Sequence, residues 1–367
     1  MKLKCERNTL LNAIQTVNKA VASKNSMSIV ECILIDATED EIKLTANNLE
    51  LAIESAVDGE IEEPGTVALE ARILQDIVRH LPNNTVTISV DNDALTKITC
   101  EKSKFKINGR RADEFPRLPK VEKDDPLTIS HTALKDMVRQ TIFSIADNEK
   151  NKVMAGELLE VRDNELKLVS LDGHRVSIRQ AKLRNSHSDV RAIIPGKTLN
   201  EVSKILSNDP EQTVDIFFTE KHILFEFGDT VVVSRLIEGD YFKLDQMLNM
   251  SFETKIDVNK MDFLSCIERA VLLTNESNKK PIIITISDNN MELKIESSIG
   301  SMHESIEITQ DGQDIMIGFN PKFLIDVLKA VDDDEISLYM INPKSPCAIK
   351  DETESYIYIV LPVNFTA

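Results

Sequence analysis

One short segment, residues 170–176 (SLDGHRV), combines groups that could perform acid–base chemistry. Asp172 and His174 stand two residues apart, and a carboxylate beside an imidazole can serve as a general acid–base pair. Such a pair also needs a nucleophile or a metal, and no other segment supplies a convincing one. An enzyme with its site at His174 stays open as one hypothesis. A binding site carried by a non-catalytic scaffold is the alternative that the repeats described below favour.

Other chemical motifs give no support to an enzyme. Gly196-Lys197 lacks the spacing of a phosphate-binding loop, and the sequence has neither a Gly-x-Ser-x-Gly elbow nor a His-Glu-x-x-His motif. The five cysteines are scattered without metal-ligand spacing, so we expect buried thiols in a reducing compartment and no metal or cofactor. No run of about 18 apolar residues occurs and no leader is apparent, so we expect a cytoplasmic protein without membrane contact.

The elements around this segment occur three times along the chain. Residues 41–44 (EIKL), 165–168 (ELKL) and 292–295 (ELKI) lie 124 and 127 residues apart, and each follows an apolar run and a polar turn. Each of these hairpins lies between two amphipathic segments whose apolar residues recur at three- and four-residue steps, as on one face of a helix. The predicted helices span residues 8–24, 71–81, 131–146, 197–206, 260–275 and 321–331.

Strands with period-2 alternation close each unit, at residues 86–90, 214–218 and 336–340, which indicates sheets with one buried face. We therefore predict an α+β fold of three similar domains, each with two helices packed on antiparallel sheets. A repeat of this length is too long for a solenoid, so each unit should bury its own core, and three in a row suggest an arc or part of a ring. The predicted domains are 1–122, 123–249 and 250–367.

The net charge of −18 argues against a nucleic-acid partner only if the charge is spread evenly. The six predicted helices together carry +6, which leaves −24 for the rest of the chain. If the helices share one surface, that surface is mildly positive on an acidic body, as in a channel that holds a polyanion. The alternative is that the positive charge of the helices is incidental, because helices often carry a few lysines that share no surface. The chain has no Trp and few aromatic residues, which argues against a base-stacking single-strand binder.

The last apolar segment, residues 356–363 (YIYIVLPV), has two interpretations. Its alternation predicts a final core strand. Its end, Leu361, Pro362 and Val363, could instead form one wall of an exposed apolar pocket, and such patches mark partner sites.

The Leu-Asp-Gly-His-Arg segment at 171–175, the Leu-Pro pair at 361–362, the Asn275-Glu276 helix exit and the three-unit layout together resemble the bacterial DNA polymerase III beta subunit, the DNA sliding clamp family. The resemblance covers the whole chain. It implies three clamp-type domains arranged as a crescent, or half ring, and a head-to-tail homodimer that closes the ring. It also implies a processivity factor, not an enzyme, that encircles duplex DNA and tethers the replicative polymerase through an apolar peptide cleft.

The resemblance also implies partners and sites. The partners would be duplex DNA, bound without sequence preference, the DNA polymerase III alpha subunit, the clamp-loader delta subunit and other clamp-binding peptides. By position, the DNA-binding residues would be Lys24, Arg72, Arg79, Asn148, Lys150, Lys152 and Lys197. The cleft would comprise Met154, Leu171, Gly173, His174, Arg175, Val176, Phe242, Met247, Phe323, Val360, Leu361, Pro362 and Val363. The dimer interface would use Phe105 and Ile107 against Leu272 and Leu273 of the other subunit.

The chain departs from the family pattern at the rim of this cleft. Phe242 stands where a proline-bearing turn is usual, Gln246 replaces an arginine, and Asn364 replaces a basic residue. Residues 25–28 replace a proline-rich entry after the first helix. We expect these differences to alter the preference for partner peptides and to leave the fold unchanged. A repeat-built protein-binding scaffold that never touches DNA remains the rival interpretation.

Overall fold

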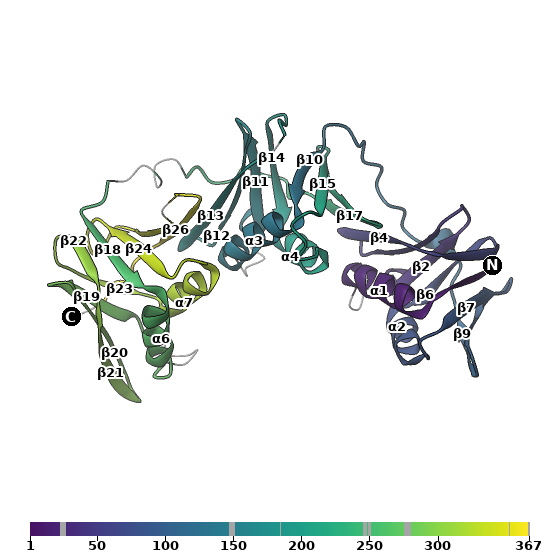
Figure 1. Ribbon diagram of the computed structural model, residues 1–367, viewed down its shortest axis with the longest axis horizontal. Helices are drawn as coiled ribbons and strands as arrows, with labels where there is room; N and C mark the ends of the chain where they lie inside the picture. Colours follow the sequence, from purple (N-terminus) through teal and green to yellow (C-terminus); the bar gives the residue numbers. More distant parts are fainter. Residues whose placement is uncertain are drawn as a thin grey trace. The chain divides into compact units, whose positions relative to one another are not determined.

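The computed structural model of the chain describes residues 1–22, 27–146, 151–183, 185–244, 248, 251–274, 280–351 and 353–365. It divides into two compact units, Met1–Thr132 with Lys204–Leu236, and Ala133–Ser203 with Ile237–Ala367. Helices and antiparallel strands occur in both (Figure 1), which confirms the α+β prediction. Within the described ranges, no helix is long and apolar enough to cross a membrane.

Six α-helices have described bounds, and they coincide with the six predicted segments. Regular helix ends earlier than predicted in the three longer ones, and in two of these a short 3₁₀ helix follows, η1 (Asn18–Ala20) and η4 (Ile142–Ser144). Each repeat contributes two of the helices: α1 (Arg7–Val17), α2 (Ala71–His80), α3 (His131–Thr141), α4 (Gly196–Ile205), α6 (Lys260–Val271) and α7 (Pro321–Ala330).

Side-chain caps define the starts of α6 and α7. The side chain of Asn259 accepts hydrogen bonds from two backbone N–H groups in the first turn of α6, and Asn320 accepts one from Lys322 of α7. These contacts satisfy N–H groups that have no partner inside the helix. Pro321 occupies the first turn of α7, where its missing N–H costs nothing.

The first unit holds a five-stranded sheet, ordered β5-β1-β7-β8-β9, and an eight-stranded sheet, ordered β10-β15-β16-β17-β4-β3-β2-β6. The larger sheet joins two repeats, because β17 of the second pairs with β4 of the first. The strands are β1 (Lys2–Glu6), β2 (Cys32–Ala37), β3 (Ile42–Asn47), β4 (Leu51–Val57), β5 (Gly59–Glu63), β6 (Gly65–Glu70), β7 (Thr85–Val90), β8 (Leu95–Cys100), β9 (Ser103–Asn108), β10 (Leu127–Ser130), β15 (Thr213–Phe218), β16 (His222–Phe227) and β17 (Thr230–Arg235).

The second unit repeats this plan with a nine-stranded sheet, ordered β14-β11-β12-β13-β26-β25-β24-β18-β22, and a four-stranded sheet, ordered β21-β20-β19-β23. Here β26 of the third repeat pairs with β13 of the second. The strands are β11 (Gly156–Arg162), β12 (Glu165–Leu171), β13 (Arg175–Lys182), β14 (Val190–Pro195), β18 (Thr254–Asn259), β19 (Ile282–Ser287), β20 (Asn290–Ser297), β21 (Gly300–Glu307), β22 (Thr309–Gly312), β23 (Ile315–Phe319), β24 (Glu335–Met340), β25 (Cys347–Lys350) and β26 (Tyr356–Val360).

The repeated polar turns are tight hairpins in the second and third repeats. Asp163 and Asn164 have φ angles of 50° and 66°, and Asp288 and Asn289 have 52° and 57°. Two consecutive positive φ values match the right-handed twist of the flanking strands, and Asp and Asn tolerate them better than most residues do.

The helices bury their apolar faces on these sheets. In the third repeat, Phe263 and Ile267 of α6 and Leu324 and Leu328 of α7 join one apolar core with the surrounding strands, and the two helices lie side by side (Figure 1). All five cysteines are buried and free, as predicted. Burial raises the pKa of the Cys347 thiol to about 12, so this thiol is an apolar filler of the core.

Candidate functional site

A mostly apolar cavity of about 180 Å³ opens in the second unit. It lies where β12 and β13 of the second repeat meet the end of β26 and the segment that follows Tyr241. Its lining residues are Met154, Leu171, Gly173, His174, Arg175, Val176, Phe242, Lys243, Leu244, Ile359 and Leu361.

Most of the residues proposed for the cleft come together here. Eight of the thirteen line the cavity: Met154, Leu171, Gly173, His174, Arg175, Val176, Phe242 and Leu361. The sequence prediction omitted Lys243, Leu244 and Ile359. The alternation of residues 356–360 and the position of Lys243 and Leu244 directly after Phe242 were signals that could have identified them.

The other five predicted cleft residues do not line the cavity. Phe323 lies on α7 with its ring 6.1 Å from the ring of His174. Val360 is fully buried in the core. Pro362 is half-buried and Val363 is 38% exposed, just beyond Leu361. Met247 lies outside the described residues.

The turn between β12 and β13 sets the mouth of the cavity. Asp172 Oδ1 accepts hydrogen bonds from the backbone N–H groups of His174 (2.9 Å) and Arg175 (3.2 Å). Gly173 has a φ of 88°, a left-handed conformation that glycine adopts without strain. The N–H of Leu361 donates to the carbonyl of His174 at 2.8 Å, so the chain that follows β26 is attached to this turn.

Arg175 forms part of the wall and is only 7% exposed. Its Nε donates to Asp172 Oδ2 (3.0 Å), Nη1 to Asp326 Oδ2 (2.6 Å) and Nη2 to the carbonyl of Phe143 (2.5 Å). Its guanidinium carbon lies 4.4 Å from the ring centre of Phe323, within cation–π range. Burial acts to lower the pKa of Arg175, but the hydrogen bond to Asp326 and the nearby carboxylates hold it above its usual value.

Residues 242–244, near the end of the second repeat, form another wall of the cavity. The buried hydroxyl of Tyr241 donates to the carbonyl of Val169 at 3.0 Å, which attaches this segment to the sheet. Phe242 packs edge-on against Tyr241 and stays 42% exposed. An apolar cavity with a few fixed polar groups is the usual form of a ligand site.

The site lacks the geometry of the acid–base hypothesis. His174 Nδ1 and Asp172 Oδ1 are 4.0 Å apart, and the imidazole is 71% exposed. Both oxygens of Asp172 already accept hydrogen bonds, from the turn and from Arg175. Among the described residues, no group of three or more His, Cys, Asp or Glu side chains could hold a metal ion.

The predicted cationic residues are exposed where they are described. Arg72 and Arg79 lie on α2, and Arg79 pairs with Asp76 at 2.8 Å. Lys197 lies in the first turn of α4, and Lys152 begins the short helix η5 (Lys152–Ala155). Lys24, Asn148 and Lys150 lie outside the described residues.

The predicted dimer contacts lie at exposed ends and edges. Phe105 is 39% exposed and Ile107 half-buried, both on β9 at one edge of the five-stranded sheet. Leu272 follows α6 and is 77% exposed, whereas Leu273 packs against the core of the third repeat.

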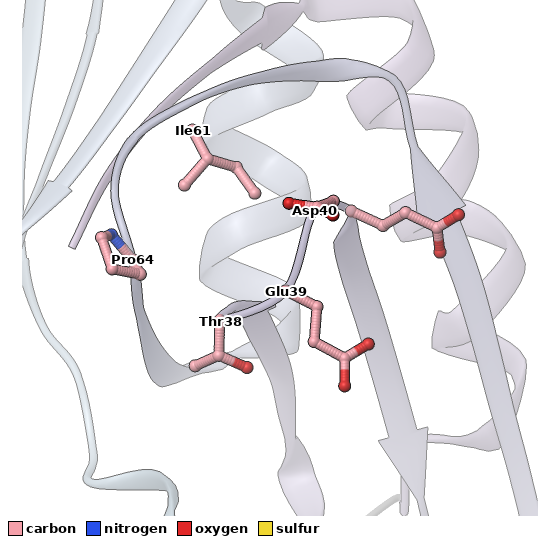
Figure 2. A pocket seen from close by; sticks show the side chains of 6 residues that line it. Thr38, Glu39, Asp40, Ile61 and Pro64 are labelled. Atoms are coloured by element: carbon pink, nitrogen blue, oxygen red, sulfur yellow. The ribbon is translucent and has the colours of Figure 1, made fainter.

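A larger hollow of about 890 Å³ lies at the turn between β2 and β3 (Figure 2). Its lining residues are Thr38, Glu39, Asp40, Glu41, Ile61 and Pro64. Lys43 lies 3.6 Å from the carboxylate of Glu39 and 3.9 Å from that of Glu41. None of the predicted site residues borders this hollow, so the smaller cavity is the better candidate.

Three family models match the chain in order. They describe the DNA polymerase III beta subunit, with its N-terminal domain at residues 1–119, its central domain at 128–243 and its C-terminal domain at 246–364. The beta sliding clamp of Bacillus subtilis is 34% identical over 383 residues, covering 99% of this chain and 100% of the relative. That of Staphylococcus epidermidis is 33% identical over 375 residues, covering 99% of both.

Solved structures show the same similarity. A putative DNA polymerase III beta subunit from Eubacterium rectale has a TM-score of 0.98 at 53% identity. The DNA polymerase sliding clamp of Bacillus subtilis has a TM-score of 0.97 at 33% identity. Both alignments cover 100% of each chain.

Proposed function

Because the chain belongs to the family of bacterial DNA polymerase III beta subunits, the sliding clamps, we propose that it is a DNA sliding clamp. Two copies form a ring around duplex DNA, each as a half ring, and the ring tethers the replicative polymerase to its template. The observation that carries this proposal is the match of three consecutive beta-subunit domains over nearly the whole chain.

Strand pairing inside the chain supports ring closure by a second copy. At both junctions between repeats, the last strand of one repeat pairs antiparallel with a strand of the preceding repeat, namely the strand that follows the repeated EIKL or ELKL hairpin. These pairs are β17 with β4, and β26 with β13. In the first repeat the strand corresponding to β17 and β26 is β9, and in the third repeat the strand corresponding to β4 and β13 is β21. Each is an outer strand of its sheet in the described topology. Pairing β9 of one copy with β21 of another continues the pattern and covers two open edges.

The side chains on these edges support the same pairing. β9 carries Lys104 and Lys106, and β21 carries the exposed Glu307 together with Glu304, which already pairs with Arg269 of α6. Opposite charges would favour the contact between two different edges over a contact between two identical ones. Phe105 and Ile107 on β9, with Leu272 and Leu273 of the other subunit, would supply its apolar part.

The proposed DNA contacts are few and cationic: Lys24, Arg72, Arg79, Asn148, Lys150, Lys152 and Lys197. Phosphate contacts of this kind bind without regard to sequence. A small number on an acidic protein suits a ring that must slide, because dense positive charge would hold it in place.

The apolar cavity is the proposed docking site for partner peptides from the DNA polymerase III alpha subunit, the clamp-loader delta subunit and other clamp-binding proteins. Leu171, Val176, Phe242 and Leu361 supply an apolar surface, and His174 and Lys243 supply polar groups at its border. Phe323, Pro362, Val363 and Met247 would extend this surface, whereas Val360 would support it from the core.

We further propose that the chain is a non-catalytic binding protein of the cytoplasm, where a bacterial chromosome is replicated. The hydrogen bonds of Asp172 support the non-catalytic role, because its two oxygens stabilise the turn and hold Arg175. The proposed domains remain 1–122, 123–249 and 250–367.

Retention on circular DNA tests the proposal. The protein is loaded on a nicked circular plasmid by its clamp loader, passed through a sizing column in moderate salt, and the plasmid is then cut with a single-site restriction enzyme. We expect retention on the circle and release after linearisation, because a ring is linked topologically.

Two outcomes would contradict this expectation. Retention that persists on the linear form would indicate ordinary DNA binding. No retention on circles, with partner binding intact, would favour the protein-binding scaffold.

A further inference from the structure

Three arginines of the second repeat each contact an aspartate of the third. Arg139 pairs with Asp332 (2.7 Å), Arg175 with Asp326 (2.6 Å), and Arg179 lies 3.6 Å from Asp351. Of these arginines, only Arg175 lines the apolar cavity.

The side chain of Arg175, which lies on β13, connects this strand to three other pieces of the second unit. Its guanidinium reaches the turn through Asp172, the 3₁₀ helix η4 through the carbonyl of Phe143, and α7 through Asp326. The ring of Phe323, also on α7, covers the guanidinium at 4.4 Å. A planar group with donors in a fixed fork is suited to hold several segments in one arrangement.

We propose that Asp326 on α7 is a positioning residue for the peptide cleft, because it orients Arg175 and, through Arg175, the turn at residues 172–174 and the ring of Phe323. This inference rests on the proposed function. Asp326 does not line the cavity, so its influence on a bound peptide would be indirect. Peptide affinity would then depend on how α7 of the third repeat is seated against the second.

The burial of the pair gives the proposal its physical basis. The side chain of Arg175 is 7% exposed and that of Asp326 is 24% exposed. Replacing the carboxylate by an amide leaves the guanidinium in place with a weaker acceptor, and an incompletely paired buried charge is unfavourable. Arg175 would then gain rotational freedom, and the wall that it forms beside Val176 would no longer be fixed.

Asp332 provides a control at the same junction, in an ion pair that does not involve Arg175. It accepts hydrogen bonds from Arg139 Nη2 and Gln140 Nε2, and it does not line the cavity. Substituting Asp332→Asn also removes a charged contact between the second and third repeats without touching Arg175, although this pair is more exposed, with Arg139 at 40% and Asp332 at 68%.

The test measures binding of the immobilised DNA polymerase III alpha subunit of the same bacterium by surface plasmon resonance. The proteins are the wild type, Asp326→Asn, Asp332→Asn, Arg175→Gln and the double variant Arg175→Gln/Asp326→Asn, each checked for thermal unfolding and dimer mass. We expect Asp326→Asn to weaken binding about tenfold and Asp332→Asn to leave it within about twofold of wild type. We expect the double variant to bind no more weakly than Arg175→Gln alone, because Asp326 acts through Arg175.

The outcomes separate this inference from the proposed function. If the wild type binds the alpha subunit and Asp326→Asn binds equally well, the positioning role is wrong and the clamp assignment stands. Equal losses in the two aspartate variants, or additive losses in the double variant, would also overturn the positioning role. If the wild type itself fails to bind, the proposed docking site is wrong.

Discussion

Leu49 and Gly173 occupy the same position in two turns with the same hydrogen bonds. Their φ angles are 77° and 88°. In each turn the preceding residue, Asn48 or Asp172, accepts through Oδ1 from the backbone N–H groups two and three residues later, at 2.9–3.2 Å. The first repeat therefore has the backbone of the cleft turn, with a leucine where the second repeat has glycine.

The residues that follow differ in chemistry. Glu50 and Leu51 stand in the first repeat where His174 and Arg175 stand in the second. The backbone attachment is kept, since the N–H of Arg235 donates to Glu50 O at 2.9 Å as Leu361 does to His174 O. Without an arginine at this position the first repeat lacks the buried guanidinium of the cleft, so the repeated scaffold carries different side chains at equivalent turns.

The φ of Leu49 predicts that Leu49→Gly stabilises the first unit. A left-handed conformation costs a non-glycine residue about 1–2 kcal/mol, and the Leu49 side chain is 51% exposed, so little packing is lost. The greater freedom of glycine in the unfolded chain offsets part of this gain. We expect a net gain of roughly 0.5–1 kcal/mol, seen as a higher thermal midpoint. Gly173→Ala should do the opposite. A lower midpoint for Leu49→Gly would show that its side chain contributes more than the strain costs.

The repeat allowed much of the fold to be predicted. Amphipathic spacing identified the six α-helices whose bounds are described, because an apolar face at three- and four-residue steps is a local signal. The ends of the helices were less accurate. Residues 142–144 follow the apolar period but form a 3₁₀ helix, and the carbonyl of Phe143 in this helix accepts a hydrogen bond from Arg175.

Pairing between repeats could not be read from the sequence. The partners β17 with β4 and β26 with β13 are separated by over a hundred residues, and an edge strand carries no local mark of its neighbour. The same holds for Arg175, whose contact with Asp326 joins residues 151 positions apart. The resemblance identified Arg175 as a cleft residue, and only the structure shows what fixes its orientation.

Glu157 predicts a pH dependence of stability in the second unit. Its side chain is fully buried, and Thr141 Oγ1 lies 2.7 Å from both Glu157 Oε2 and the carbonyl of Met137. The hydroxyl has one proton and the carbonyl only accepts, so a protonated Glu157 completes the arrangement by donating its own. Burial raises the pKa of Glu157 to about 8. Burial and the nearby Glu157 charge raise the pKa of the Tyr241 hydroxyl.

The sign follows from proton binding. In the unfolded chain Glu157 ionises near its ordinary pKa of 4.5, and in the folded chain near 8. The stabilising contribution is present below pH 4.5 and is lost as the pH rises toward 8, because the unfolded state releases its proton first. Glu157→Gln should remove this dependence. We expect the thermal midpoint of the wild type to fall more between pH 5 and pH 8 than that of the variant, with the exposed Glu165→Gln as control. Parallel pH profiles for all three would refute the buried-acid interpretation.

Arg72 and Arg79 predict a change in the salt dependence of DNA binding. Both are exposed on α2, so Arg72→Glu with Arg79→Glu should preserve the fold. Each lost phosphate contact should reduce the slope of log affinity against log salt by about one, hence about two in all, and equally for duplexes of different sequence. Fluorescence anisotropy with two unrelated duplexes measures this salt dependence.

The control variant, Lys182→Glu with Lys344→Glu, makes the same charge change at two exposed lysines outside the helices. If that control lowers the slope equally, general charge and not α2 governs binding.

Phe105 predicts where the ring closes. It is 39% exposed on β9, the edge strand proposed to meet β21 of a second copy, and Phe105→Asp would place a charge in the apolar part of that contact. Truncating a central aromatic residue of an interface commonly weakens it on the order of tenfold or more, and a buried unpaired charge adds to the loss. We expect sedimentation velocity to show a shift from dimer to monomer. Met316→Asp, at a residue 43% exposed on β23, should leave the dimer intact.

Because the cleft lies wholly in the second unit, the Phe105→Asp monomer should still bind the alpha subunit while losing retention on circular DNA. A Phe105→Asp protein that stays dimeric would place the closing interface on other strands.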